Sequence, residues 1–161
     1  MAGAAPALDV PLHPHLRVVA ERGPFVLLDV HSYHHRRDGA GEPAAPAEEN
    51  PEVNVGTGSV DYGRFGPLVE RFIGDLRDAS LGCGPIDARE NVVFEGRNLA
   101  WWVHDRYPRV GCVLALEFKK TFMDEWTGEV DHARIDELAR ALASTVPSVE
   151  EALRTVGVND R

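Results

Sequence analysis

The stretch Phe25–Val30 (FVLLDV) constrains this chain most, because it is rich in Val and Leu and ends abruptly at His31. Such a run predicts a strand buried on both faces, as in a parallel sheet. Ligands of open parallel sheets bind just beyond the carboxyl ends of the strands, which is where His31 falls. A neutral imidazole at this place can ligate a metal, move a proton or form a hydrogen bond in the core. The residues alone leave these alternatives open.

Composition sets the size and charge class of the protein. A chain of 161 residues with 43% hydrophobic residues is long enough to bury one core, so we expect a single α/β domain over residues 1–161. The net charge of −9 disfavours a nucleic-acid or anionic-membrane partner.

Targeting features are expected to be absent. The leader Met1–Leu8 has no basic region followed by an apolar one, so it does not resemble a signal peptide. No apolar run approaches the roughly 18 residues needed to cross a bilayer. Cys83 and Cys112 form neither a metal-type pair nor a disulfide framework. The expected compartment is the cytoplasm.

Apolar spacing and turn residues place the other elements. Helices are expected at 14–21, 65–79, 98–107, 131–145 and 147–157, and further strands at 52–56, 91–94 and 110–118. The segment 37–50 is rich in Gly, Pro, Ala and Glu and is expected to be a mobile loop. Helices that alternate with apolar strands indicate an α/β sheet with right-handed crossovers.

Glu117 is the second chemically unusual residue, because it interrupts the otherwise apolar strand 110–118. An uncompensated carboxylate in a low dielectric is costly, so it has either a raised pKa or a cationic or metal partner. A raised pKa suits a general base. The alternatives are an ion pair with Lys119 or Lys120, or a strand end that has already reached water.

Cations follow three strand or turn ends of this acidic protein. They form the clusters His34-His35-Arg36-Arg37, Arg97 after Gly96, and Lys119-Lys120. Three basic clusters at such positions indicate an anion site. Each cluster taken singly is also compatible with a solvated face.

Several segments carry a resemblance to a known family. They are Leu28-Asp-Val-His-Ser-Tyr33, Asn54-Val-Gly-Thr-Gly58, Phe94-Glu-Gly96 and Leu114-Ala-Leu-Glu-Phe-Lys-Lys-Thr-Phe-Met-Asp-Glu125. Together they resemble the N-formylglutamate amidohydrolases, from about Pro14 to the last helix. The resemblance implies a fold similar to that of the zinc carboxypeptidases, with a mixed, largely parallel central sheet flanked by helices.

The resemblance also implies a mechanism and a substrate. The His of the His-Ser-Tyr segment corresponds to a zinc ligand, which makes His31 the metal residue here, and Glu117 would be the general base for a metal-bound water. The cofactor would be zinc and the substrate a small N-acyl (formyl) acidic amino acid. Arg36, Arg37 and Arg97 are the candidates for binding its carboxylates.

The zinc ligands are incomplete in this sequence. The family's other ligands, a His and an acidic residue, come from a segment upstream of the His-Ser-Tyr strand, and the thirty residues before His31 contain no His-x-x-Glu. A catalytic zinc normally takes three protein ligands and a water. The chain therefore resembles the C-terminal part of the family, and the alternative to an active hydrolase is a non-catalytic remnant that binds a ligand or oligomerises. Uncovered sheet edges or apolar faces predict a homo-oligomer.

Overall fold

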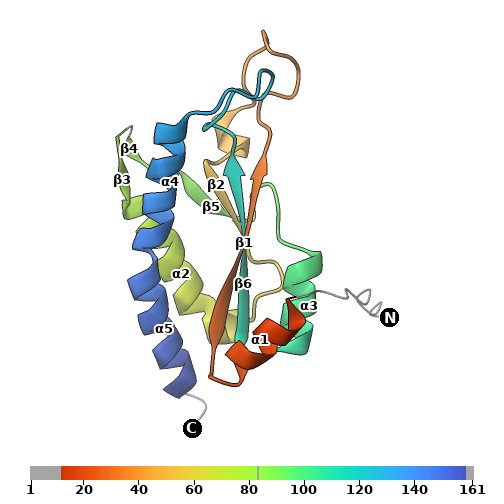
Figure 1. The fold of residues 1–161 in the computed structure, drawn as a ribbon, viewed down its shortest axis with the longest axis vertical. Helices are drawn as coiled ribbons and strands as arrows, with labels where there is room; N and C mark the ends of the chain where they lie inside the picture. Colours follow the sequence, from red (N-terminus) through yellow and green to blue (C-terminus); the bar gives the residue numbers. More distant parts are fainter. Residues whose placement is uncertain (1–11, 83, 159–161) are drawn as a thin grey trace.

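A computed structural model describes residues 12–82 and 84–158 of the chain (Figure 1). The helices are α1 (His13–Ala20), α2 (Tyr62–Asp78), α3 (Asn98–Arg106), α4 (His132–Ser144) and α5 (Val146–Val158), with a 3-10 turn η1 at Ala47–Glu49. The strands are β1 (Phe25–Tyr33), β2 (Val53–Gly56), β3 (Ser80–Leu81), β4 (Gly84–Pro85), β5 (Ala88–Glu90) and β6 (Gly111–Lys119).

The central sheet is mixed and has the strand order β1-β6-β2-β5. β1 runs parallel to β6, and β2 runs parallel to β5, whereas β6 and β2 are antiparallel. Strands β3 and β4 form a separate hairpin. The expected fold class, a mixed and largely parallel α/β sheet flanked by helices, is confirmed.

One face of the sheet carries the main core. Helices α2, α4 and α5 cover this face (Figure 1). α2 forms because its apolar residues recur at helical spacing, and the stripe that they make is buried against the strands. The buried side chains of this stripe are Phe65, Leu68, Val69, Phe72, Ile73 and Leu76.

The other face is covered by helices over only part of its length. α1 and α3 pack against the amino-terminal halves of β1 and β6, where Phe25 and Val113 meet Leu16 and Val103 (Figure 1). Beyond these helices the same face carries polar residues on the carboxyl halves of both strands. This uncovered half of the face holds the candidate site.

The sequence-based expectation for β1 was wrong in one respect. The strand is not buried on both faces in the middle of a parallel sheet, because it lies at the edge of the four-stranded sheet. Its carboxyl half is open, and 55% of the Val30 surface is exposed. Composition reports how apolar a strand is but not which strands pair with it.

The strand expected at 91–94 was also wrong. The neighbouring strand is β5, which ends at Glu90, and Asn91 turns the chain with a positive φ of 51°. Residues 92–94 are then held by a side chain of β2, described below, and not by a ladder. The expected helix at 98–107 is present as α3, but Asn98 is its first residue and makes no side-chain cap.

Some expectations stay predictions. Met1–Leu8 and Cys83 lie outside the described residues, and Cys112 is a free, buried thiol. No helix in the described part of the chain is long and apolar enough to cross a membrane. The single-domain organisation over residues 1–161 and the mobility of loop 37–50 remain untested.

Candidate functional site

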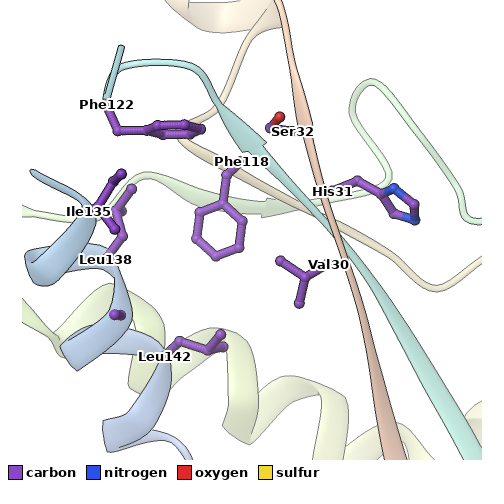
Figure 2. A pocket seen from close by; sticks show the side chains of 9 residues that line it. Val30, His31, Ser32, Phe118, Phe122, Ile135, Leu138 and Leu142 are labelled. Atoms are coloured by element: carbon purple, nitrogen blue, oxygen red, sulfur yellow. The ribbon is translucent and has the colours of Figure 1, made fainter. Parts of the chain in front are cut away.

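His31 lies in the carboxyl half of β1 and is oriented by an aspartate. Side chains two residues apart on a strand share a face, so Asp29 lies beside His31, and its Oδ1 is 2.8 Å from His31 Nε2. A carboxylate accepts hydrogen bonds, so Nε2 is the donor of this pair and Nδ1 lies away from it. Figure 2 shows the imidazole on the opposite side of β1 from the apolar side chains around Val30. The ring is half exposed, with 54% of its side-chain surface open.

Glu117 lies directly beside His31 on the neighbouring strand. The two residues are register partners in the parallel pair β1–β6, so both lie at the same end and on the same face of the sheet. Burial raises the pKa of the Glu117 carboxyl, the nearby His31 opposes this shift, and Asp29 adds to it. The uncovered half of the sheet therefore brings together one imidazole and two carboxylates.

Among the described residues, neither Lys119 nor Lys120 contacts Glu117, so the alternative of an ion pair with a neighbouring lysine has no support. Lys119 Nζ donates a hydrogen bond to Asn50 O at 2.8 Å, and Lys120 Nζ lies 2.9 Å from His34 Nε2. Within residues 12–82 and 84–158, no ion pair involves Glu117. The Glu117 side chain is half-buried.

Asn54 of β2 is the register partner of Glu117 on its other side and positions a loop beside the site. The side chain is fully buried, and its Oδ1 accepts hydrogen bonds from Val92 N at 2.9 Å and Val93 N at 2.8 Å. Its Nδ2 donates to Phe94 O at 2.8 Å. One side chain therefore fixes loop 91–97 against the sheet.

Glycines allow the same loop to approach the sheet closely. A Cβ on Gly56 would lie 2.6 Å from Gly96 N, and Gly96 itself has a positive φ of 77°. A Cβ on Gly96 would lie 3.1 Å from that of Ala115, two residues before Glu117. The segments Asn54–Gly58 and Phe94–Gly96, which are far apart in the sequence, therefore meet at the site.

Tyr33 is the last residue of β1 and lies on the same face of the strand as His31, two residues further along. Its hydroxyl donates a hydrogen bond to Pro51 O, and its ring packs edge-on against Phe94 with the centroids 5.8 Å apart. Burial raises the pKa of Tyr33 to about 12, which keeps the phenol protonated. Tyr33 is therefore a structural hydrogen-bond donor at neutral pH.

The predicted arginines have different environments. Arg36 and Arg37 follow β1, and burial raises the pKa of Tyr33 although the Arg37 guanidinium nearby opposes that rise. Arg37 Nε donates to His34 O at 3.1 Å, whereas Arg36 Nε is buried without a hydrogen-bond partner in the described part of the chain. Arg97 is exposed just before α3, and no described contact joins it to His31 or Glu117.

The histidines after β1 are paired with an internal carboxylate. Glu125 Oε1 accepts a hydrogen bond from His35 N at 2.8 Å and lies 2.8 Å from His35 Nδ1, while Oε2 is 3.2 Å from His34 Nδ1. Burial raises the pKa of this carboxyl, but the backbone donors of His35 and Arg36 outweigh that effect and lower it. This basic cluster therefore fastens the loop after β1 to the loop after β6.

Sequence reasoning missed two residues of the site. Asp29 could have been found, because it lies two positions before His31 on an expected strand and so shares its face. Asn54 offered a weaker signal, a polar residue inside a short apolar strand. Its role depends on a loop about forty residues further along the chain, and no local pattern reports such a contact.

The described residues do not build a catalytic zinc centre by themselves. In residues 12–82 and 84–158, no three His, Cys, Asp or Glu side chains lie together in a way that could hold a metal ion. The Asp29–His31 pair does fit one part of such a centre, because metal-binding histidines usually give their other ring N–H to a carboxylate. The chain therefore presents one oriented histidine and a base, without a full ligand set.

Comparisons with known proteins support the fold. No protein-family model matches the chain, and no curated protein matches it. Among solved structures, the chain is similar to an N-formylglutamate amidohydrolase from Ralstonia eutropha JMP134, with 18% sequence identity and a TM-score of 0.61. The match covers 90% of this chain and 51% of that chain, so this chain spans about half the length of its structural neighbour.

Proposed function

We propose that this chain carries the catalytic half of an amide hydrolase. The observation that supports the proposal best is the pairing of His31 with Glu117 across two parallel strands, on the half of the face that no helix covers. Glu117 has no ion-pair partner in the described part of the chain, and burial raises its pKa. A base with a raised pKa is matched to proton transfer near neutral pH.

Glu117 acts as the general base in this proposal. Its carboxylate takes a proton from the water that attacks the amide carbonyl and then delivers the proton to the leaving nitrogen. Asn54 holds loop 91–97 beside Glu117, so the surroundings of the proposed base have a fixed shape.

His31 is proposed as one ligand of a zinc ion. The hydrogen bond that His31 Nε2 donates to Asp29 holds the ring and leaves Nδ1 as the nitrogen without this partner. The other ligands would come from outside the described residues of a single chain. The isolated chain is therefore expected to hold zinc weakly.

The proposed substrate is an N-acyl acidic amino acid, such as the N-formylglutamate after which the structural neighbour is named. A dicarboxylate needs cationic partners, and guanidinium groups match carboxylates in a bidentate manner. Arg36 and Arg37 follow the strand that carries His31, and Arg97 ends the loop that Asn54 holds beside Glu117, so all three are candidates for these partners.

A second candidate function rests on the missing ligands. Without a full ligand set in the described residues, the chain fits a non-catalytic relative that binds a ligand or oligomerises. Such a protein would retain the fold and the Asp29–His31 pair but would not turn over substrate.

The two candidates separate in one assay. Formate release from N-formyl-L-glutamate is measured with and without added zinc, with N-formyl-L-leucine as the control substrate. The proposal predicts zinc-stimulated release that prefers the acidic substrate. The absence of release under all conditions, with a folded protein, would favour the non-catalytic relative.

A further inference from the structure

The outer edge of β1 is an unpaired strand edge next to an apolar groove. Phe25 N donates to Val110 O and Tyr33 O accepts from Lys120 N, so residues 25, 27, 29, 31 and 33 direct their backbone groups toward β6. The alternate residues, 26, 28, 30 and 32, direct theirs outward. In the described sheet no strand pairs with this side of β1.

The groove lies between the exposed edge of β1 and α4. It encloses about 430 Å³, and Figure 2 shows apolar side chains from β1, β6 and α4 facing into it. The residues that matter most here are Val30, Phe118, Phe122, Ile135 and Leu142. Val30 is 55% exposed and Ile135 is 38% exposed. An apolar strand edge beside an apolar groove is a surface that proteins usually cover.

We propose that a second copy of this chain covers this surface by antiparallel pairing of β1 with β1 around Val30. In this register Val30 faces Val30 and Leu28 faces Ser32, so each copy pairs its outward-facing residues with those of the other. The side chain of Leu28 from the second copy then lies beside Ser32, over the groove. The pairing extends the sheet across both copies.

Charge favours this register over the one centred on Asp29. Around Val30, Asp29 of each copy stands opposite His31 of the other, which places a carboxylate next to an imidazole. A twofold axis at Asp29 would place the two Asp29 carboxylates opposite each other, and like charges directly opposite destabilise a strand pair. Of the symmetric registers that the outward-facing residues of β1 allow, the one around Val30 is the one that places Asp29 opposite His31.

The pairing also changes the candidate site. His31 and Asp29 from both copies would lie on one face of the joined strands, beside the Glu117 residues of both copies. A site that lacks ligands in one chain would then draw on two histidines and several carboxylates. This consequence rests on the proposed function, whereas the strand pairing itself does not.

Sedimentation of purified full-length protein tests the pairing without any activity measurement. We expect a dimer in the micromolar range, and we expect Val30→Lys to shift it to monomer, because lysine at a strand edge opposes pairing. Val92→Lys is the matched control, since Val92 is 40% exposed and lies beside β2 and β5. A wild-type protein that stays monomeric at about 100 micromolar would overturn the proposal. A Val30→Lys variant that stays dimeric would also overturn it.

Cross-linking tests the register. In a Cys83→Ser background, Val30→Cys should form an intermolecular disulfide under mild oxidation, because Cα atoms of a hydrogen-bonded antiparallel pair lie about 5.5 Å apart, within disulfide range. Leu28→Cys alone should cross-link far less, and a mixture of Leu28→Cys with Ser32→Cys chains should restore the product. Cross-linking of Val92→Cys to the same extent as Val30→Cys, or a dimer without the Val30→Cys product, would overturn the register. A confirmed dimer without hydrolysis would refute the proposed function alone.

Discussion

Replacing Gly56 by alanine tests whether the loop beside Glu117 is held by close backbone packing. An alanine Cβ would lie 2.6 Å from Gly96 N and 2.8 Å from the carbonyl carbon of Glu95. Both atoms belong to the backbone, so no flexible side chain can yield. The loop must therefore move away from β2, or β2 must distort.

The expected loss of stability in Gly56→Ala is the cost of inserting a methyl group into a packed site, about 1–3 kcal/mol. For a domain of this size each kcal/mol changes Tm by about 2–4 °C, so Gly56→Ala should lower Tm by roughly 2–12 °C. Gly74→Ala is the matched control, because Gly74 lies within α2 and an added Cβ would meet nothing within 4 Å. Alanine favours a helix interior by about 1 kcal/mol over glycine, so this control should raise Tm by about 2–4 °C.

Thermal unfolding of the two variants and the wild type, followed by circular dichroism at one protein concentration, provides the comparison. The same substitution is predicted to act in opposite directions at the two positions. A Gly56→Ala protein as stable as the wild type would refute the close packing of loop 91–97 on β2. Amide hydrogen exchange should also quicken in loop 91–97 of Gly56→Ala, and not in Gly74→Ala.

Three further outcomes are expected. Burial raises the pKa of Glu117 in the folded protein, so the protein loses stability as the pH rises through that pKa and the buried carboxyl ionises. Glu117→Gln should therefore raise Tm at pH 7 and change it little at pH 4. A lower Tm at pH 7 would indicate an ion pair instead. Burial lowers the pKa of His104, and its Nε2 accepts a hydrogen bond from Val113 N at 2.9 Å. The free energy of unfolding should therefore fall as the pH drops below about 6.5, where the imidazole of the unfolded chain takes up a proton. A His104→Gln variant whose stability depends on pH as steeply as that of the wild type would contradict this role of His104. His31→Ala should reduce zinc content after zinc loading and desalting, measured by elemental analysis, and an unchanged zinc content would remove His31 as a ligand.

The helices and the two long strands could be predicted because their signals are local. The apolar stripe of α2 and the apolar run of β6 before Glu117 report burial on their own. The pairing of His31 with Glu117 could be predicted only as far as a shared sheet end. Their direct register depends on how β1 aligns with β6, and the paired residues are 86 positions apart (31 and 117).

Other features depended on contacts that no local pattern carries. The apolar run of β1 predicts a central strand, but its place at the sheet edge depends on which other strands are present to pair with it. The segment 91–94 has the composition of a strand, yet the buried amide of Asn54 binds its backbone first. The basic residues after β1 indicate an anion site, and for the side chains of His34 and His35 the anion is Glu125, ninety residues further on.

The turnover of Glu117→Gln tests the central claim, that Glu117 is the base of a hydrolase, most directly. The glutamine keeps the shape of the side chain but cannot accept the proton. Formate release from N-formyl-L-glutamate, measured with zinc present and alongside the melting curve of the same sample, should fall by about 100- to 10,000-fold while the protein stays folded. Turnover equal to that of the wild type in a folded Glu117→Gln protein would contradict the claim.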